Sequence, residues 1–325
     1  MGSEMCIRDR KNGLNGSIGT RPENILRGVS LIIAATLTIS IQDVVFKFFS
    51  SELTLWQIFA LRGLLAVPML LVITIVRRRQ YGVLRAALTR WSILRAISIT
   101  VTFLAFYSAI PFLSLSTVGA ANYIAPIFVT LLSAYVIREA VGPLGWLGVF
   151  IGFSGMIVLL QPGTDAFSPW AFLPVLGAAF YAVAHIITRT KCQTVPLAAL
   201  ALSQNLVMLC AGLIVSVILL WLKPQGDIPN TYPYIFGMWS SVSLSDWLVL
   251  ALLASFAIVI GMLLAGAYQA APPSIVSTFE YSYLVFVAVW DILFFSNSPT
   301  ISSVTGMMLI VVAGLLVLRR KNQSH

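Results

Sequence analysis

The sequence STVGAANYIAPIFVTLLSAYVIREAVGPLGWLGVFIGFSGMIVLLQPG, residues 116–163, contains two apolar runs separated by the short turn REAVG. A helix needs about 20 predominantly apolar residues to cross a bilayer. Each run meets this length, because the runs extend over residues 113–137 and 143–161. The stretch therefore predicts two consecutive membrane-spanning helices joined by a tight connection.

The same pattern continues along the whole chain. Of its 325 residues, 59% are hydrophobic and only 10% are charged, whereas soluble domains carry about 25% charged residues. The apolar runs are too long and too uniform for barrel strands, so helices are the expected form. We predict an all-α integral membrane protein of about ten transmembrane helices. The further runs lie at residues 28–49, 54–76, 92–110, 168–189, 196–222, 247–268, 272–294 and 301–318.

The formal net charge of +9 comes from basic residues in a few connections and near the ends of the chain. Nucleic-acid binding is excluded, because no binding motif and no surface of interleaved basic and aromatic residues is present. Basic connections stay in the cytoplasm, so we expect a multi-pass protein of the cytoplasmic (inner) membrane with both termini cytoplasmic. In a ten-span order, these basic groups fall on one side: Arg21 and Arg27, residues 77–95, Arg138, Arg189 with Lys191, and Arg319–Lys321.

The two halves of the chain resemble each other. With a shift of 158 residues, TVGAANYIAPIFV (117–129) lies on IVSTFEYSYLVFV (275–287), and Asn122 falls on Glu280. Each half contains about five predicted helices, an odd number, so the second half would insert upside down relative to the first. We expect five-helix repeats at residues 27–162 and 168–321. They would follow a disordered cytoplasmic tail at residues 1–26, whose first ten residues look non-native.

Three segments resemble EamA-type transporters of the drug/metabolite transporter superfamily. They are LRGLLAVPMLL (61–71), the stretch at 116–163, and APPSIVSTFEYSYLVFVAVW (271–290) with its recurring Glu280–Tyr281 pair. The chain departs from many relatives in FFSNSPT, where Asn297 stands in place of an acidic residue. The resemblance implies ten helices in two inverted repeats, a central cavity, alternating access and a small metabolite as cargo.

Glu280 lies inside an apolar run, where a carboxylate needs either a partner or a function. Glu280, Tyr283, Val287 and Asp291 recur at helical spacing and would form one stripe with a carboxylate at each end. Glu280 is either a neutral group that donates one structural hydrogen bond, or a residue that binds a substrate amine or takes up a proton. Its partner would be Arg62, Asn122 or the substrate itself.

Asp43 and Arg62 lie at a similar depth on consecutive predicted helices. They form either a structural ion pair, a gate, or a site in which Arg62 binds a substrate carboxylate through its planar fork. His185 is interpreted as a hydrogen-bonded structural residue, with a proton relay as the alternative. Further candidates for the lining of the cavity are Phe103, Phe106, Tyr107, Asn122, Tyr123, Tyr268 and Gln269.

The leading functional hypothesis is a secondary transporter of a zwitterion, such as an amino acid or an adenosylmethionine-like compound. Its partners would be lipid, protons or a counter-substrate, and it would act as a monomer or homodimer without a cofactor. The alternative is a channel or membrane sensor for small solutes. A membrane-embedded enzyme is disfavoured, because the sequence has no catalytic motif and its two histidines and three cysteines have no metal-ligand spacing. We therefore predict no catalytic and no metal-binding residues.

Overall fold

The computed structural model describes residues 24–48, 53–76, 80–109, 112, 124–160, 170, 172–222, 232–295 and 301–319. All regular secondary structure in these residues is helical. The expected N-terminal tail up to residue 23, together with Asn122, Tyr123 and Asn297, lies outside the described residues. Through residue 160 the helices are α1 (Ile25–Phe48), α2 (Leu55–Val76), α3 (Gln80–Ala87), α4 (Arg90–Ala109), α6 (Ala125–Leu132), the π-helix η1 (Ser133–Ile137) and α7 (Pro143–Leu160).

Most helices of the second half agree with the spans predicted from the sequence. The predicted spans at residues 168–189, 196–222, 247–268 and 301–318 correspond closely to α8, α9, α12 and α15. The predicted span at 272–294 is divided into two helices. The elements are α8 (Phe172–Lys191), α9 (Leu197–Leu222), the single turn α11 (Pro233–Phe236), α12 (Leu244–Ala270), α13 (Pro273–Glu280), α14 (Ser282–Phe295) and α15 (Ile301–Arg319).

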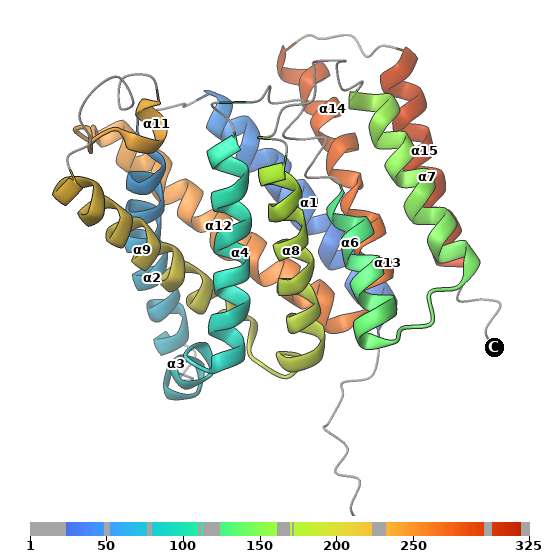
Figure 1. Cartoon of the computed structure of the whole chain (residues 1–325), viewed down its shortest axis with the longest axis horizontal. Helices are drawn as coiled ribbons and strands as arrows, with labels where there is room; N and C mark the ends of the chain where they lie inside the picture. The colour runs from blue at the N-terminus through green and yellow to red at the C-terminus, as the bar shows by residue number, and fades with distance from the viewer. Residues whose placement is uncertain are drawn as a thin grey trace, which may run out of the picture.

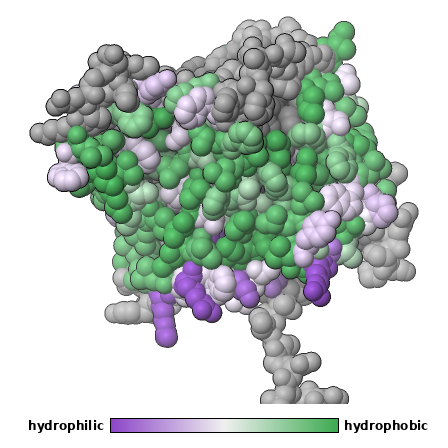
Figure 2. Space-filling model, in the orientation of Figure 1, coloured by the Kyte–Doolittle hydropathy of each residue, from purple (hydrophilic) through white to green (hydrophobic). Residues whose placement is uncertain are grey.

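The lengths and compositions of the helices are those of a multi-pass membrane protein. Six of them, α1, α2, α4, α8, α9 and α12, are long and apolar enough to cross a membrane, and shorter apolar helices occupy residues 125–137, 143–155 and 304–313. Many exposed side chains are Leu, Ile and Val, as expected for contact with lipid. A broad hydrophobic band covers the bundle, and the most hydrophilic side chains of this face lie along its lower edge (Figure 2).

Helices from the first half of the chain pack against helices from the second half. α2 packs on α9, α7 on α15 and α6 on α13. α4 packs on α8 and α1 packs on α12 (Figure 1). Both of the last two pairs are antiparallel, since the N–H of Asn24, before α1, bonds to the carbonyl of Ala270 at the end of α12, and Arg95 near the start of α4 bonds to Thr188 near the end of α8.

Small residues allow the closest of these contacts. On α2, a Cβ at Gly63 would lie 2.8 Å from Leu209 Cβ on α9, and one at Gly212 on α9 would lie 2.7 Å from the backbone nitrogen of Ala60. On α7, a Cβ at Gly152 would lie 2.7 Å from Tyr281 Cδ2. Gly152, together with Gly155, where a Cβ would lie 2.9 Å from the carbonyl oxygen of Gly306 on α15, therefore allows α7 to pack closely within the molecule.

The predicted ninth span differs from a single helix. α13 ends at Glu280, Tyr281 forms a turn, and α14 begins at Ser282. Glu280 and the other members of the expected stripe, Tyr283, Val287 and Asp291, therefore lie on two successive helices that meet at Tyr281. In the other half, η1 ends in Arg138, which has a left-handed backbone with φ of 60°.

Candidate functional site

Glu280 lies at the C-terminal end of α13, where two tyrosines bind its carboxylate. Tyr181 of α8 donates its hydroxyl to Glu280 Oε1 at 2.8 Å, and Tyr268 of α12 donates to the same oxygen at 2.6 Å. No described residue donates to the other oxygen, Oε2. Of the partners named by the sequence, Arg62 is therefore replaced by two hydroxyl groups, and Asn122 lies outside the described residues. A carboxylate held in this way keeps one oxygen for a further donor or cation.

An aromatic stack continues from this carboxylate. The His185 ring lies 3.9 Å from the ring of Tyr268 in a nearly parallel arrangement, and 4.2 Å from the ring of Tyr181 edge-on. His185 is fully buried, and neither of its ring nitrogens has a hydrogen-bond partner among the described residues. The expected hydrogen-bonded structural histidine is thus wrong, since ring stacking holds His185 in place.

Arg95 of α4 continues the same cluster towards the end of α8, and only 1% of its surface is exposed. Its Nε donates to Thr188 Oγ1 at 2.7 Å, while Thr188 donates to the carbonyl of Ala184. Nη1 and Nη2 have no partner in the described part of the chain. Sequence reasoning counted Arg95 among the basic residues that report orientation. Its position inside the predicted span at 92–110 was the signal that could have identified it as a buried charge.

Three residues of α8 make up one face of this cluster. Tyr181, His185 and Thr188 are four and three residues apart, so they lie one above another on the helix. Together with Arg95, Tyr268 and Glu280 they form what we call the α8 polar ladder, which has a carboxylate at one end and a guanidinium at the other. Sequence reasoning missed Tyr181, since a single tyrosine in an apolar helix carries no specific signal.

Asp43 and Arg62 have other partners. The hydroxyl of Tyr283 on α14 donates to Asp43 Oδ2. Arg62 is buried in the aromatic cluster around Phe59 and donates from Nη2 to the sulfur of Met208 at 3.3 Å. The two charges make no ion pair with each other, so the structural reading of this pair is wrong in this conformation. Tyr107 lies within electrostatic range of both.

The remaining candidates are divided between packing and the ladder. Tyr107 stacks on Phe103 with ring centroids 6.1 Å apart, and Phe106 lies against Gly177 of α8. Gln269 Nε2 donates to the carbonyls of Cys192 and Val195, which fixes the turn after α8. The Tyr281 ring is buried against α7 and Asp291 lies on α14. Of all the residues predicted for the site, the ladder brings together Glu280, His185 and Tyr268.

Comparison with known families gives one match, to the EamA-like transporter family, over residues 26–161. The match covers less than half of the 325 residues. The resemblance stated from the sequence is confirmed, and with it the assignment as a membrane transporter.

Full-length relatives are also transporters by name. The EamA-like chain is 21% identical over 301 residues to an S-adenosylmethionine uptake transporter of Rickettsia prowazekii, covering 92% of this chain and 95% of the relative. It is 25% identical over 301 residues to the pseudopaline exporter CntI of Pseudomonas aeruginosa, covering 90% and 96%. A solved crystal structure superposes with a TM-score of 0.70 at 15% identity, over 91% of this chain and 97% of the other. That likeness shows the fold.

The EamA-like half and the second half are tied together at one end of the bundle. Thr130 Oγ1 on α6 lies 3.5 Å from Ser277 Oγ on α13. Ser133 of η1 and Ser274 of α13 both donate to the carboxylate of Glu139. This end also contains the start of α1 and the end of α15 (Figure 1), so the basic residues Arg27, Arg138 and Arg319 lie near it.

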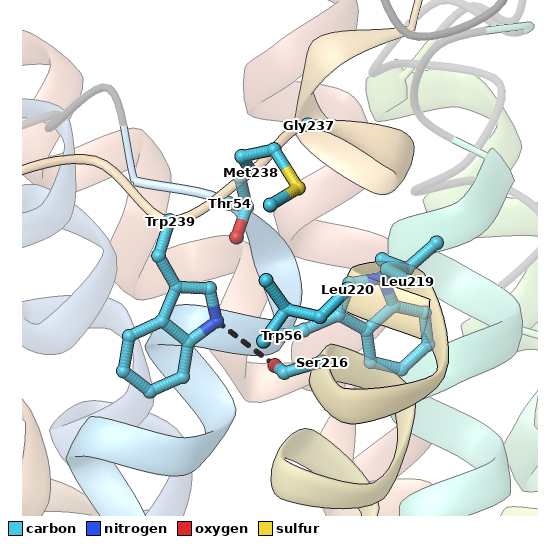
Figure 3. Close-up of a pocket in the computed structure, with 8 residues that line it drawn as sticks. All are labelled: Thr54, Trp56, Ser216, Leu219, Leu220, Gly237, Met238 and Trp239. Atoms are coloured by element: carbon cyan, nitrogen blue, oxygen red, sulfur yellow. Dashed lines mark hydrogen bonds between the residues drawn. The ribbon is translucent and has the colours of Figure 1, made fainter. Parts of the chain in front are cut away.

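A small pocket lies at the opposite end of the EamA-like chain, between α2, α9 and the segment after α11 (Figure 3). Trp239 Nε1 donates to Ser216 Oγ at 2.9 Å on one side of it. Its walls are mainly apolar, and it contains none of the residues of the polar ladder. We therefore place the candidate site at the ladder and not at this pocket.

Proposed function

We propose that the protein is a secondary transporter that moves a small zwitterionic metabolite across the cytoplasmic membrane by alternating access. The observation that carries the proposal is the carboxylate of Glu280, held by Tyr181 and Tyr268 at an interruption between two helices. Interrupted helices at the interface of two repeats are typical substrate sites of secondary transporters. Oxygen Oε2 is the group that would bind an ammonium or sulfonium on the substrate, or a proton.

The pairing of the helices supports alternating access. Suppose that α1, α2, α4, α6 and α7 are exchanged for α8, α9, α12, α13 and α15, in that order, and the reverse. The α4–α8 contact then becomes the α1–α12 contact, and the contacts α2–α9, α6–α13 and α7–α15 stay as they are. We therefore assign residues 27–162 and 168–321 as two inverted five-helix repeats, and we place the basic end and both termini in the cytoplasm. The printed names of the relatives, an uptake transporter for S-adenosylmethionine and an exporter for pseudopaline, support a metabolite with both charged and polar groups.

Counterflow in proteoliposomes tests this function. Vesicles containing the full chain are loaded with unlabelled S-adenosylmethionine, amino acids or sugars, and uptake of the same labelled compound is followed. We expect transient accumulation of one zwitterion, and loss of at least about 90% of it in Glu280→Gln, because a charge-assisted contact is worth about 1.5–3 kcal/mol.

Asp246→Asn is the matched control, because this carboxylate caps the start of α12 and lies outside the α8 polar ladder. It should keep the accumulation. A variant Glu280→Gln that is monodisperse and transports like the wild type would remove Glu280 from the mechanism. Flux that fails to saturate and shows no counterflow would indicate a channel.

A further inference from the structure

The guanidinium of Arg95 and the imidazole of His185 are the most deeply buried unpartnered polar groups in the described residues. Arg95 is 1% exposed and His185 is 0% exposed. Nη1 and Nη2 of Arg95 and both ring nitrogens of His185 have no hydrogen-bond partner there. The two side chains are neighbours, since Arg95 bonds to Thr188, less than one turn beyond His185 on α8.

Such an arrangement is costly unless it serves to bind something. A buried donor without a partner destabilises the fold, and more so when it is charged. The carboxylate of Glu280 does not relieve this cost, because Tyr181 and Tyr268 bind it at the other end of the ladder. The Nε of Arg95 is already fixed by Thr188, so the two Nη groups are held in a defined direction. A fixed pair of guanidinium donors matches the two oxygens of a carboxylate.

We infer that Arg95 and His185 form a binding site for the carboxylate of the transported molecule, at the end of the α8 polar ladder opposite Glu280. The inference rests on the proposed function and adds the chemistry of the second end of the substrate. Glu280 takes the cationic group, and Arg95 with His185 takes the carboxylate. The ligand class is therefore an amino acid or related zwitterion in which the two charges lie apart.

The spacing along α8 sets the scale of the distance between the two charges. Tyr181, which contacts Glu280, and Thr188, which contacts Arg95, are seven residues apart, or about 10 Å at 1.5 Å per residue. An α-amino acid carries its ammonium and carboxylate on one carbon, so it cannot reach both ends. A molecule with several atoms between the groups can reach both.

Ligand-dependent thermal stabilisation of the purified full chain tests the site without requiring transport. The probes are ω-amino acids from glycine to 8-aminooctanoate, each paired with its methyl ester, which keeps the ammonium and removes the negative charge. We expect the acids to bind at least about tenfold more tightly than their esters, because a charge-assisted contact is lost. We expect the tightest binding for 8-aminooctanoate, whose extended length is close to the separation estimated above.

The variants locate the effect. Arg95→Gln should bind acid and ester equally, and Arg95→Lys, which keeps the charge but loses the fork, should weaken binding of the acid about tenfold. Arg90→Gln is the matched control on the same helix, since Arg90 is exposed beside Trp91, and it should keep the wild-type preference. If Arg95→Gln does not yield monodisperse protein, the acid binding of Arg95→Lys alone tests the site.

Equal binding of acids and esters by the wild type, no binding of any acid, or tightest binding of glycine would each overturn the inference. So would an unchanged acid preference in Arg95→Lys. These results are distinct from failure of the proposed function. Counterflow of some tracer without an acid preference would overturn only this site, whereas acid binding without any counterflow would overturn only the carrier.

Discussion

Two carboxylates of the bundle are held by tyrosine hydroxyls, and they differ in depth. Glu280 is half-buried and receives two hydroxyls on one oxygen, while Asp43 is exposed and receives one from Tyr283. A tyrosine donates a hydrogen bond but leaves the charge of the carboxylate unneutralised, unlike a lysine or arginine. Inside a membrane this choice is expensive, about 2.5–3.5 kcal/mol for a charge at the centre. Under the proposed function, the carboxylate of Glu280 is kept for a partner that arrives, and Asp43 has a local role.

The largest effect on transport should follow from removing the two tyrosine hydroxyls that donate to Glu280. In the double variant Tyr181→Phe/Tyr268→Phe, the carboxylate loses its two described donors, and each loss should reduce transport about tenfold because an unsatisfied buried group costs about 1–3 kcal/mol. Counterflow of the single and double variants measures this. A double variant with wild-type flux would refute the importance of the tyrosines and make the two carboxylates equivalent.

A smaller effect on stability and transport is expected from overpacking the side chain of Tyr281, which lies between α13 and α14. In Gly152→Ala, the new Cβ would lie 2.7 Å from the ring of Tyr281, and such overpacking costs about 1–3 kcal/mol. The thermal unfolding midpoint of the protein should fall, and the apparent affinity of the transported substrate should fall with it. Gly82→Ala on α3 is the control, because a Cβ there meets nothing within 4 Å, and that variant should keep or slightly raise the midpoint.

The exposed carboxylate should respond weakly. Asp43→Asn and Tyr283→Phe remove the same hydrogen bond at an exposed position, so stability should change by no more than about 0.5 kcal/mol. Transport should stay within about twofold of the wild type in both, as measured by initial rates of counterflow. A loss as large as that of the Glu280 tyrosines would show that depth does not separate the two carboxylates.

The smallest effect concerns Asp43 and Arg62 together. Because Arg62 bonds to Met208 and Asp43 to Tyr283, neutralising both should destabilise the protein by the sum of the single changes, within about 0.5 kcal/mol. A double-mutant cycle with Asp43→Asn and Arg62→Gln, followed by chemical unfolding, measures the coupling free energy between the two residues. A coupling above about 1 kcal/mol would restore the ion pair considered from the sequence.

The long helices were predictable because the apolar composition of each segment is enough to identify it, without knowledge of its tertiary contacts. The apolar runs at α2 and α9 are continuous, and hydropathy alone sets their length. The break at Tyr281 was not predictable, since Phe279, Tyr281 and Tyr283 are compatible with an uninterrupted helix and no glycine or proline marks the turn. It depends on contacts from elsewhere, including Gly152 against the Tyr281 ring and Thr36 of α1 within 2.9 Å of Ser282.

The site was predictable at one end only. Glu280 stood out as a carboxylate in an apolar run, whereas Arg95 lies close to a basic connection and gave the same signal as a residue that marks orientation. Tyr181 and Tyr268 reach Glu280 from α8 and α12, so their roles arise from tertiary packing. The ion pair expected between Asp43 and Arg62 shows the same limit, because equal depth on two helices does not determine which way the side chains face.

The tie between α6 and α13 has a mechanical consequence. It is made of short hydroxyl groups, Thr130 with Ser277, and Ser133 and Ser274 with Glu139. Hydrogen bonds between membrane helices contribute only about 0.6 kcal/mol on average, and hydroxyls can exchange one acceptor for another over a short displacement. The polar contact between α6 and α13 is thus weakly bonded, so we expect these two helices to shift along one another more easily than the closely packed α2 and α9.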